Sequence, residues 1–348
     1  MGSPRSVSGQ DIADARFPIQ DVYDLVLEGF LLHSLGEYEM PPKQGVHTRA
    51  RSFMHAMPAY LPTKRLAGTK LISVYPENVE RGLDATTGII VMMDPDSGIV
   101  SDIVDARWIT NTRTAMVSMV DTKLLAKENP VFGIVGATGS CGRAHIAAIG
   151  AIFPGSQVIV NSRSQERCEH LLDEFDHLPC QLVVRMDPEA VVKECDVLIV
   201  CTSNLLQPIF KAEWLRPGQN VLNVHGRGWP PSITSLVDRI SCDDRSQLLD
   251  PMGGLTDAYP NLNPDFELGD VVAGEHPGRE SSAYVTPPTR GQSTTRPPGR
   301  CRQGRSGAPI ALTSPSAPRE SRAPAAPRRS GSGIRSPRRP RCFPHWLR

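Results

Sequence analysis

Val131-Phe-Gly-Ile-Val-Gly-Ala-Thr-Gly-Ser-Cys-Gly142 is a short apolar run followed by a glycine-rich loop, and a helical stretch begins near Arg143. Glycines between a buried strand and a helix let the backbone turn tightly and approach a pyrophosphate. The free N–H groups at the helix N-terminus then bind that pyrophosphate. The segment therefore predicts the first unit of a Rossmann-type dinucleotide domain. The spacing of its glycines is one residue wider than G-x-G-x-x-G, and a purely structural turn is the alternative.

The sequence around this loop alternates apolar strands with helical stretches. Strands are predicted at 131–135, 157–161, 181–184, 196–201 and 220–225. Short β-branched runs at this spacing are typical of parallel strands with helices on both faces. Residues 128–270 are therefore predicted to form a doubly wound α/β domain that binds NAD(P).

Residues 1–127 have a different pattern and are predicted to form a separate α+β domain. Apolar residues recur at helical spacing over 21–36 and again over 106–127, while 56–75 and 88–104 contain strands separated by turns. Residues 271–286 are expected to begin a return of the chain to this first domain.

Two parts of the α/β domain are candidate cofactor contacts. The pyrophosphate contacts are expected at Gly136, Gly139, Ser140, Cys141 and Gly142. The second strand ends in Asn161, Ser162 and Arg163, where NAD-specific enzymes place an acidic residue for the ribose hydroxyls. A neutral pair followed by a cation suits a 2′-phosphate, so NADP is predicted in preference to NAD. In the alternative interpretation, Arg163 only begins the next helix.

Two cations occur among apolar residues. Arg113 shares the apolar stripe of helix 106–127, at i+4 from Ile109, and Lys70 shares its strand face with Ile72 and Val74. A buried guanidinium needs an anionic partner, because an unpaired buried charge is very costly. That partner is either a structural carboxylate or the carboxylate of a substrate, and spacing alone favours neither. A lysine at a strand end can also simply reach solvent.

Charge and cysteine content bound the class of protein. The net charge of +1 combines a tail, 287–348, of net charge +13 with residues 1–286 at −12. None of the eight cysteines has a spacing suited to zinc, and no apolar run is long enough to span a membrane. We therefore expect a cytoplasmic protein with free thiols, no metal site and no membrane partner.

The tail is unlike the rest of the chain. It has fourteen arginines and no lysine, and twelve of its 62 residues are proline. Such a composition cannot bury a core and predicts disorder. Arginine without lysine is also typical of an out-of-frame reading of GC-rich coding sequence. An evolved nucleic-acid arm is the alternative, but only Phe343 and Trp346 provide aromatic support, so no nucleic-acid partner is expected.

Several motifs along the chain identify a family. They are Met57-Pro-Ala-Tyr60, Gly68-Thr-Lys-Leu-Ile-Ser-Val-Tyr-Pro-Glu-Asn78, Asp94-Pro-Asp-Ser-Gly98, Arg113-Thr-Ala115, Gly133-Ile-Val-Gly136, Thr202-Ser203, Asn223-Val-His-Gly226 and Gly274-Glu-His-Pro-Gly-Arg279. In order and spacing they resemble the ornithine cyclodeaminase/mu-crystallin family over roughly residues 20–283. The resemblance implies a substrate/dimerisation domain, a Rossmann domain and a homodimer, if the C-terminal segment permits one.

The resemblance also implies roles for individual residues. Arg113 would hold the substrate carboxylate, Lys70 would lie near the reacting carbon, and Lys43 would be a third carboxylate-binding cation. Thr114 resembles a cofactor-phosphate contact, and Thr202 and Ser203 resemble residues beside the nicotinamide.

The sequence departs from the family in two places. Cyclodeaminases of the family place an Asp where this chain has Gly228, and without a carboxylate base ornithine ring closure is harder to support. His225 is the nearest candidate acid/base, although a lone histidine at a strand end is more often structural. In addition, the family's closing strand and helix are replaced by the Pro/Arg-rich tail, so this segment is expected to be missing.

The sequence therefore predicts an NAD(P)-dependent enzyme that moves hydride to or from a small L-amino acid or cyclic imine. Two alternatives remain open. One is true ornithine cyclodeamination, with release of ammonia. The other is a non-catalytic NADP(H)-binding protein, as mu-crystallin-like proteins can be, or the defective product of a frameshifted gene.

Overall fold

The structure is a computed structural model that describes residues 3–49, 51–202, 205, 207–250 and 254–279. The tail 287–348 and Ser203 lie outside the described residues, so the predictions made for them stay predictions. None of the described helices is both long enough and apolar enough to cross a membrane.

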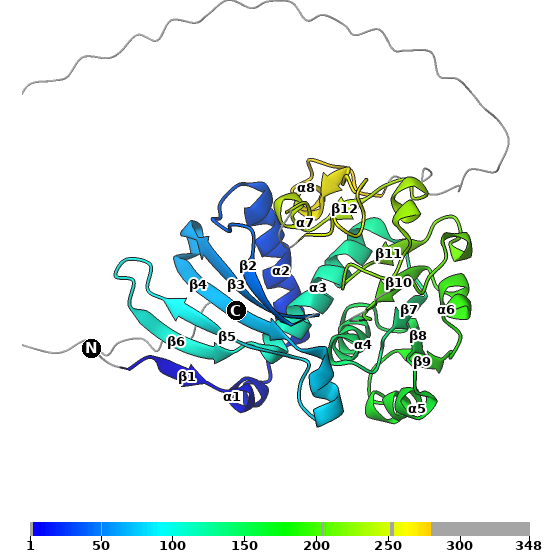
Figure 1. Ribbon diagram of the computed structural model, residues 1–348, viewed down its shortest axis with the longest axis horizontal. Helices are drawn as coiled ribbons and strands as arrows, with labels where there is room; N and C mark the ends of the chain where they lie inside the picture. Colours follow the sequence, from blue (N-terminus) through cyan, green and yellow to red (C-terminus); the bar gives the residue numbers. More distant parts are fainter. Residues whose placement is uncertain (1–2, 50, 203–204, 206, 251–253, 280–348) are drawn as a thin grey trace, which may run out of the picture. The chain divides into compact units, whose positions relative to one another are not determined.

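The N-terminal part contains a six-stranded sheet in the order β1-β6-β5-β4-β3-β2 (Figure 1). Its strands are β1 (Arg5–Val7), β2 (Gln44–Arg49), β3 (Ser52–Leu61), β4 (Leu66–Val74), β5 (Thr86–Met93) and β6 (Val100–Asp105). Its helices are α1 (Gly9–Asp14), α2 (Ile19–Ser34) and α3 (Arg107–Leu125). The β1–β6 pair is parallel and the other pairs are antiparallel. Strand β4 has a neighbour on each side, and Lys70 pairs with Met57 and Ile90.

The second sheet is fully parallel and has the order β11-β10-β7-β8-β9. It consists of β7 (Phe132–Val135), β8 (Gln157–Asn161), β9 (Gln181–Val184), β10 (Val197–Val200) and β11 (Asn220–Leu222), with α4 (Ser140–Ile152), α5 (Gln165–Glu174) and α6 (Pro188–Glu194). Helices α4 and α5 share one apolar cluster with the sheet, and α6 belongs to the cluster on the other face. The predicted doubly wound fold is confirmed. Its strand order reverses between β7 and β10, which is where such sheets bind ligands.

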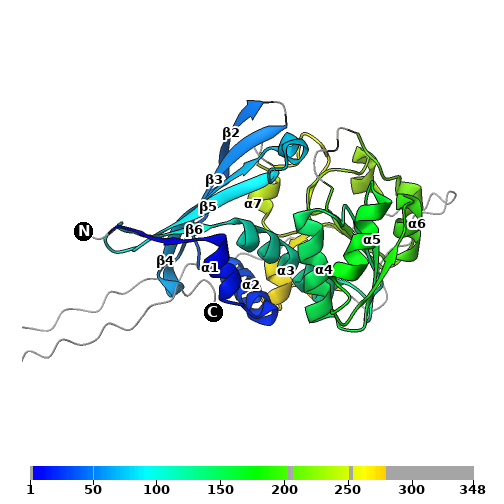
Figure 2. The same ribbon diagram turned by 90° about the horizontal axis from the view of Figure 1, so that it is seen from below.

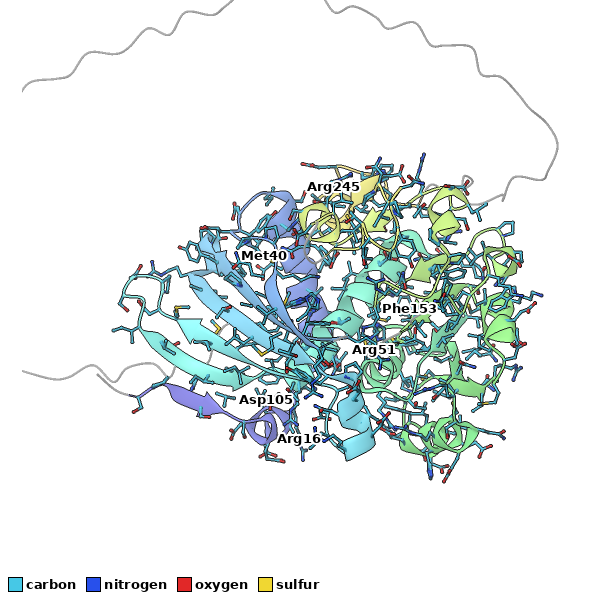
Figure 3. All side chains as sticks on the ribbon, viewed as in Figure 1. Arg16, Met40, Arg51, Asp105, Phe153 and Arg245 are labelled. Carbon is cyan, nitrogen blue, oxygen red and sulfur yellow. The ribbon has the colours of Figure 1, made fainter. Side chains whose placement is uncertain are left out.

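Helix α3 packs against both α2 and α4, and Figure 2 shows α3 beside these helices from a second direction. Its residues Ala115, Met116 and Met119 are fully buried in the same cluster as Phe132. Phe153, labelled in Figure 3, follows α4. Its ring packs edge-on against that of Phe132, with ring centroids 5.2 Å apart. One core therefore continues across the boundary predicted at residues 127/128, and that division stays a prediction.

The described chain ends with a segment of short elements. These are β12 (Ser241–Cys242), α7 (Arg245–Leu248), β13 (Phe266–Glu267) and α8 (Leu268–Val272). Helix α8 packs on α2 so closely that a Cβ on Gly269 would lie 3.0 Å from the Phe30 carbonyl oxygen. The Arg279 guanidinium donates to the carbonyl oxygens of Leu125 and Gly218. The C-terminal end of the described chain is thus hydrogen-bonded to the last residue of α3 and to the loop before β11.

Candidate functional site

The loop between β7 and α4 is held tightly enough to require glycine at two positions. Gly136 has a φ of +88°, and a Cβ there would lie 2.8 Å from the Cys201 carbonyl group. A Cβ on Gly142 would lie 2.5 Å from the Ala137 carbonyl oxygen. Gly139, by contrast, has room for a Cβ and is the N-cap of α4. Of these three glycines, Gly139 is therefore the one that close packing does not require.

The N-terminus of α4 is available to a ligand. No side chain in the described part of the chain caps it, so Ser140, Cys141 and Gly142 present first-turn N–H groups that have no acceptor within the helix. Such a helix end favours a pyrophosphate through these N–H groups and through its dipole. The loop therefore suits the phosphates of a dinucleotide.

Gly142 permits a direct test of the close packing in this loop. We expect Gly142→Ala to lower the free energy of unfolding by about 1–3 kcal/mol, because the added methyl overpacks against rigid backbone. Gly29→Ala is the matched control, since nothing lies within 4 Å of its Cβ position in α2. That control should be neutral or slightly stabilising. Urea unfolding measures both, and equal effects of the two substitutions would contradict the packing argument.

The three cofactor contacts predicted at the end of β8 differ in their bonding: two have hydrogen-bond partners within the protein, and the third has none among the described residues. Asn161 is buried, and its amide donates to the Arg185 carbonyl at 2.7 Å. Ser162 Oγ lies 2.8 Å from Thr138 Oγ1 of the phosphate loop. Arg163 is exposed and makes no hydrogen bond or ion pair to any other described residue. Arg163 is therefore the cation that remains available to a ligand here.

Two buried side-chain oxygen atoms that have no hydrogen-bond partner among the described residues lie just beyond the neighbouring strands β10 and β11. They are Thr202 Oγ1 and Asn223 Oδ1. A Cβ on Gly136 would lie 3.0 Å from the Thr202 backbone nitrogen, so Thr202 borders the phosphate loop. Buried polar atoms normally have a hydrogen-bond partner. These two suit the carboxamide of a nicotinamide, which offers both donors and an acceptor. Asn223 is missing from the residues predicted individually, although it begins the motif Asn223–Gly226.

The three predicted substrate cations come together. Burial lowers the pKa of Lys70 to about 7, and the charges of Arg113 and Lys43 act in the same direction. Burial also lowers the pKa of Arg113. Within the described residues, the side chains of these three cations form no hydrogen bond or ion pair. Three neighbouring cations that are unpaired among the described residues, two of them substantially buried, are suited to an anion.

Elements from distant parts of the chain position this cation cluster, which consists of Lys43, Lys70 and Arg113. Lys70 lies on β4 and Arg113 on α3. Lys43 lies in the loop before β2, where its backbone N–H donates to Gln247 Oε1 of α7 at 3.1 Å. Gln247 Nε2 in turn donates to the Pro41 carbonyl oxygen. Gln247 is therefore a positioning residue that no sequence motif indicated.

One carboxylate lies near this cluster. Asp243 raises the pKa of Arg113 and so opposes the effect of burial, although the two groups form no ion pair. It follows β12 directly. No residue predicted from the sequence pointed to Asp243, and the fold brings it near Arg113. A carboxylate beside the anion site is a candidate partner for the amino or imino nitrogen of a ligand.

The remaining predicted residues lie around the phosphate loop. Thr114 Oγ1 donates to the Thr110 carbonyl oxygen within α3, one turn from Asn111, which accepts a long hydrogen bond from Ser140 Oγ. His225 is exposed after β11 and contacts Cys141. Hydrogen bonding from Cys201 lowers the pKa of Cys141, and the contacts of Cys141 with its histidine neighbours act in the same direction.

Gly228 cannot easily be replaced by the family's aspartate. Its φ is +135°, a region that L-residues rarely adopt, and a Cβ would lie 3.1 Å from the Phe210 ring. Its carbonyl oxygen accepts hydrogen bonds from the backbone N–H groups of Ile209 and Phe210. The backbone at this position is therefore adapted to glycine.

Comparison with known proteins agrees with this architecture. The family model described as ornithine cyclodeaminase/mu-crystallin matches residues 8–287, which confirms the resemblance predicted from the motifs. The nodulation efficiency protein NfeD of Rhizobium meliloti is 30% identical over 80% of this chain and 87% of its own. Alanine dehydrogenase of Archaeoglobus fulgidus is 25% identical over the same shares. Delta(1)-pyrroline-2-carboxylate reductase of Thermococcus litoralis, solved with NADH and L-proline, has a similar fold (TM-score 0.72, 22% identity, 81% of this chain and 90% of that one).

Proposed function

Because the chain belongs to the ornithine cyclodeaminase/mu-crystallin family, we propose that it is an oxidoreductase that uses a nicotinamide dinucleotide and acts on a small L-amino acid or cyclic imine. The observation that carries this proposal is the cation cluster, which has no counter-ion in ion-pair contact among the described residues. The carboxylate of an amino or imino acid supplies that counter-ion.

The residues of the cluster have separable tasks. Arg113 binds the substrate carboxylate through its planar fork, and Lys43 adds a second positive charge. Lys70, with its pKa near 7, changes protonation state easily around neutral pH and can exchange a proton with the substrate nitrogen at its Nζ. His225 and Asp243 are the other groups able to move a proton. The cofactor supplies or accepts the hydride.

Gly228 favours hydride transfer over cyclodeamination. A carboxylate at this position would need a strained backbone and would approach Phe210. The two alternatives to this proposal are ornithine cyclodeamination and cofactor binding without catalysis, and the test distinguishes all three.

The test uses the full-length chain with NADH and NADPH. We expect oxidation of the reduced cofactor with Δ1-pyrroline-2-carboxylate or with pyruvate plus ammonia. Ornithine converted to proline and ammonia without net consumption of cofactor would instead indicate the cyclodeaminase. Tight binding of the cofactor, without turnover of any of these compounds, would indicate a binding protein.

NADP is the proposed cofactor in preference to NAD, and Arg163 is the residue that supports it. Arg163→Ala should raise the KM for NADPH about 10- to 100-fold, since a charge-assisted hydrogen bond contributes about 1.5–3 kcal/mol. The KM for NADH should change little, which makes NADH the internal control. Steady-state kinetics with both cofactors measures the effect. An equal change for both would contradict a contact between Arg163 and the 2′-phosphate.

We also propose that the protein is a homodimer, formed through the exposed face of the six-stranded sheet. Leu71 of β4 and Ile89 of β5 are paired neighbours with exposed fractions of 43% and 39%, and Met54 on β3 is 48% exposed. Contiguous exposed apolar side chains on a sheet indicate an association surface. A sedimentation measurement on Leu71→Glu, which should yield the monomer, tests this surface.

A cytoplasmic location is part of the same proposal. The six described cysteines are all free, which suits a reducing compartment.

A further inference from the structure

Two cysteine thiols and one imidazole cluster at the first turns of α4, and these side chains have no role in the proposed reaction. Cys141 and His145 are one turn apart on α4, and Cys201 follows β10. The thiols are 3.8 Å apart, and His145 Nδ1 lies 3.7 Å from Cys141 Sγ and 3.6 Å from Cys201 Sγ. No spacing rule indicated this group, because 60 residues separate the cysteines in sequence.

These distances match the edges of a tetrahedral metal site. With Zn–S bonds of about 2.3 Å and Zn–N bonds of about 2.05 Å, a tetrahedral ion separates two sulfurs by about 3.8 Å and sulfur from nitrogen by about 3.6 Å. A disulfide would instead require the sulfurs to approach to about 2.05 Å. The three atoms therefore already have the separations that a bound ion needs.

His145 also has the outer contact of a metal ligand. Its Nε2 lies 2.9 Å from Ser118 Oγ, and both residues are buried. A hydrogen bond to the far nitrogen orients a metal-bound imidazole and selects its tautomer. Nδ1 also lies 2.8 Å from the Cys141 carbonyl oxygen, so in the metal-free chain it can donate a proton there. Binding of an ion exchanges that proton for the metal.

We propose that Cys141, His145 and Cys201 bind one thiophilic divalent cation of the zinc class. Two thiolates and one imidazole leave the fourth tetrahedral position for water or a further ligand. His225, which contacts Cys141 and is exposed, is the neighbouring imidazole in the described chain. The ion joins the start of α4 to the end of β10, at the point where the strand order of the sheet reverses. This proposal replaces the expectation that the chain has no metal site, and it does not depend on the proposed reaction.

Cobalt(II) is the probe, added to the full-length chain after reduction. We expect one equivalent to bind and to give the thiolate-to-cobalt absorption and visible bands of a tetrahedral site. Cys141→Ser and Cys201→Ser should each weaken binding at least about 100-fold, because each removes a direct ligand. Cys180→Ser is the control and should bind normally, since Cys180 lies outside the cluster. Zinc should then displace the cobalt stoichiometrically.

Unchanged circular dichroism and thermal unfolding of the serine variants show that loss of binding is not loss of fold. The proposal is overturned if the reduced chain binds no cobalt or zinc, or if Cys141→Ser binds as well as Cys180→Ser. It is also overturned if hydrogen peroxide couples the two thiols to a disulfide, with release of two waters, in a chain that takes up no metal. In that case the pair is a thiol switch.

Discussion

Arg113→Met is expected to lower kcat/KM for the amino or imino acid by about 10²- to 10⁴-fold, because it removes two charge-assisted hydrogen bonds of about 1.5–3 kcal/mol each. The same substitution should raise the stability of the ligand-free protein. Arg113 is desolvated and forms no ion pair among the described residues, and replacing a poorly compensated buried charge by an apolar side chain of similar volume often stabilises by about 1–4 kcal/mol. Activity and stability should therefore change in opposite directions.

Arg113→Lys is the matched control for this prediction. It keeps the charge but loses the planar fork, so we expect an intermediate loss of activity and little gain in stability. Steady-state kinetics and urea unfolding of the three proteins separate these effects. A destabilised Arg113→Met protein with a normal KM for the substrate would instead identify Arg113 as a structural partner of Asp243.

The parallel sheet could be predicted from the sequence because each of its strands is a short, continuous apolar run. Strands β8 and β9 begin and end at the predicted residues, since turns and helix caps bound them on both sides. Strands β1 and β2 are different. Almost all of their residues are exposed, so neither has the apolar alternation that distinguishes a strand from a loop. These two segments are strands because they pair with β6 and β3, respectively.

The candidate site was only partly predictable for a related reason. Spacing placed Arg113 on an apolar stripe but could not decide between a structural carboxylate and a substrate. Arg113 forms no ion pair with any described residue, and this favours the substrate. Gln247 and Asp243 approach the cation cluster from a segment more than 120 residues after Arg113, and Cys201 approaches Cys141 from another strand. Such contacts depend on the order of strands in the sheets, which local patterns do not specify.

The protonation of Lys70 should make substrate binding depend on pH. Its pKa near 7 is low because of burial and the neighbouring cations, and a bound carboxylate will raise it. Binding should therefore take up a proton when the pH is above 7, and affinity should fall by up to about tenfold per pH unit there. Calorimetry in buffers of different ionisation enthalpy measures the proton uptake directly. Lys70→Met should abolish it, whereas Lys64→Met, at an exposed ion pair with Glu28, should leave it unchanged.

The same shift has a consequence for stability, and its sign is opposite to that of a paired lysine. The folded chain holds Lys70 at a pKa near 7, while the unfolded chain has the ordinary value of 10.5, so between these values the unfolded state binds more protons. The Lys70 contribution is therefore most destabilising below pH 7 and disappears as the pH rises toward 10.5. Lys70→Met should be more stable than the parent chain at pH 6, and the difference should shrink steadily by pH 10. A difference that stays constant over this range would show that Lys70 remains protonated, and the anion site would then hold its full charge at every pH tested.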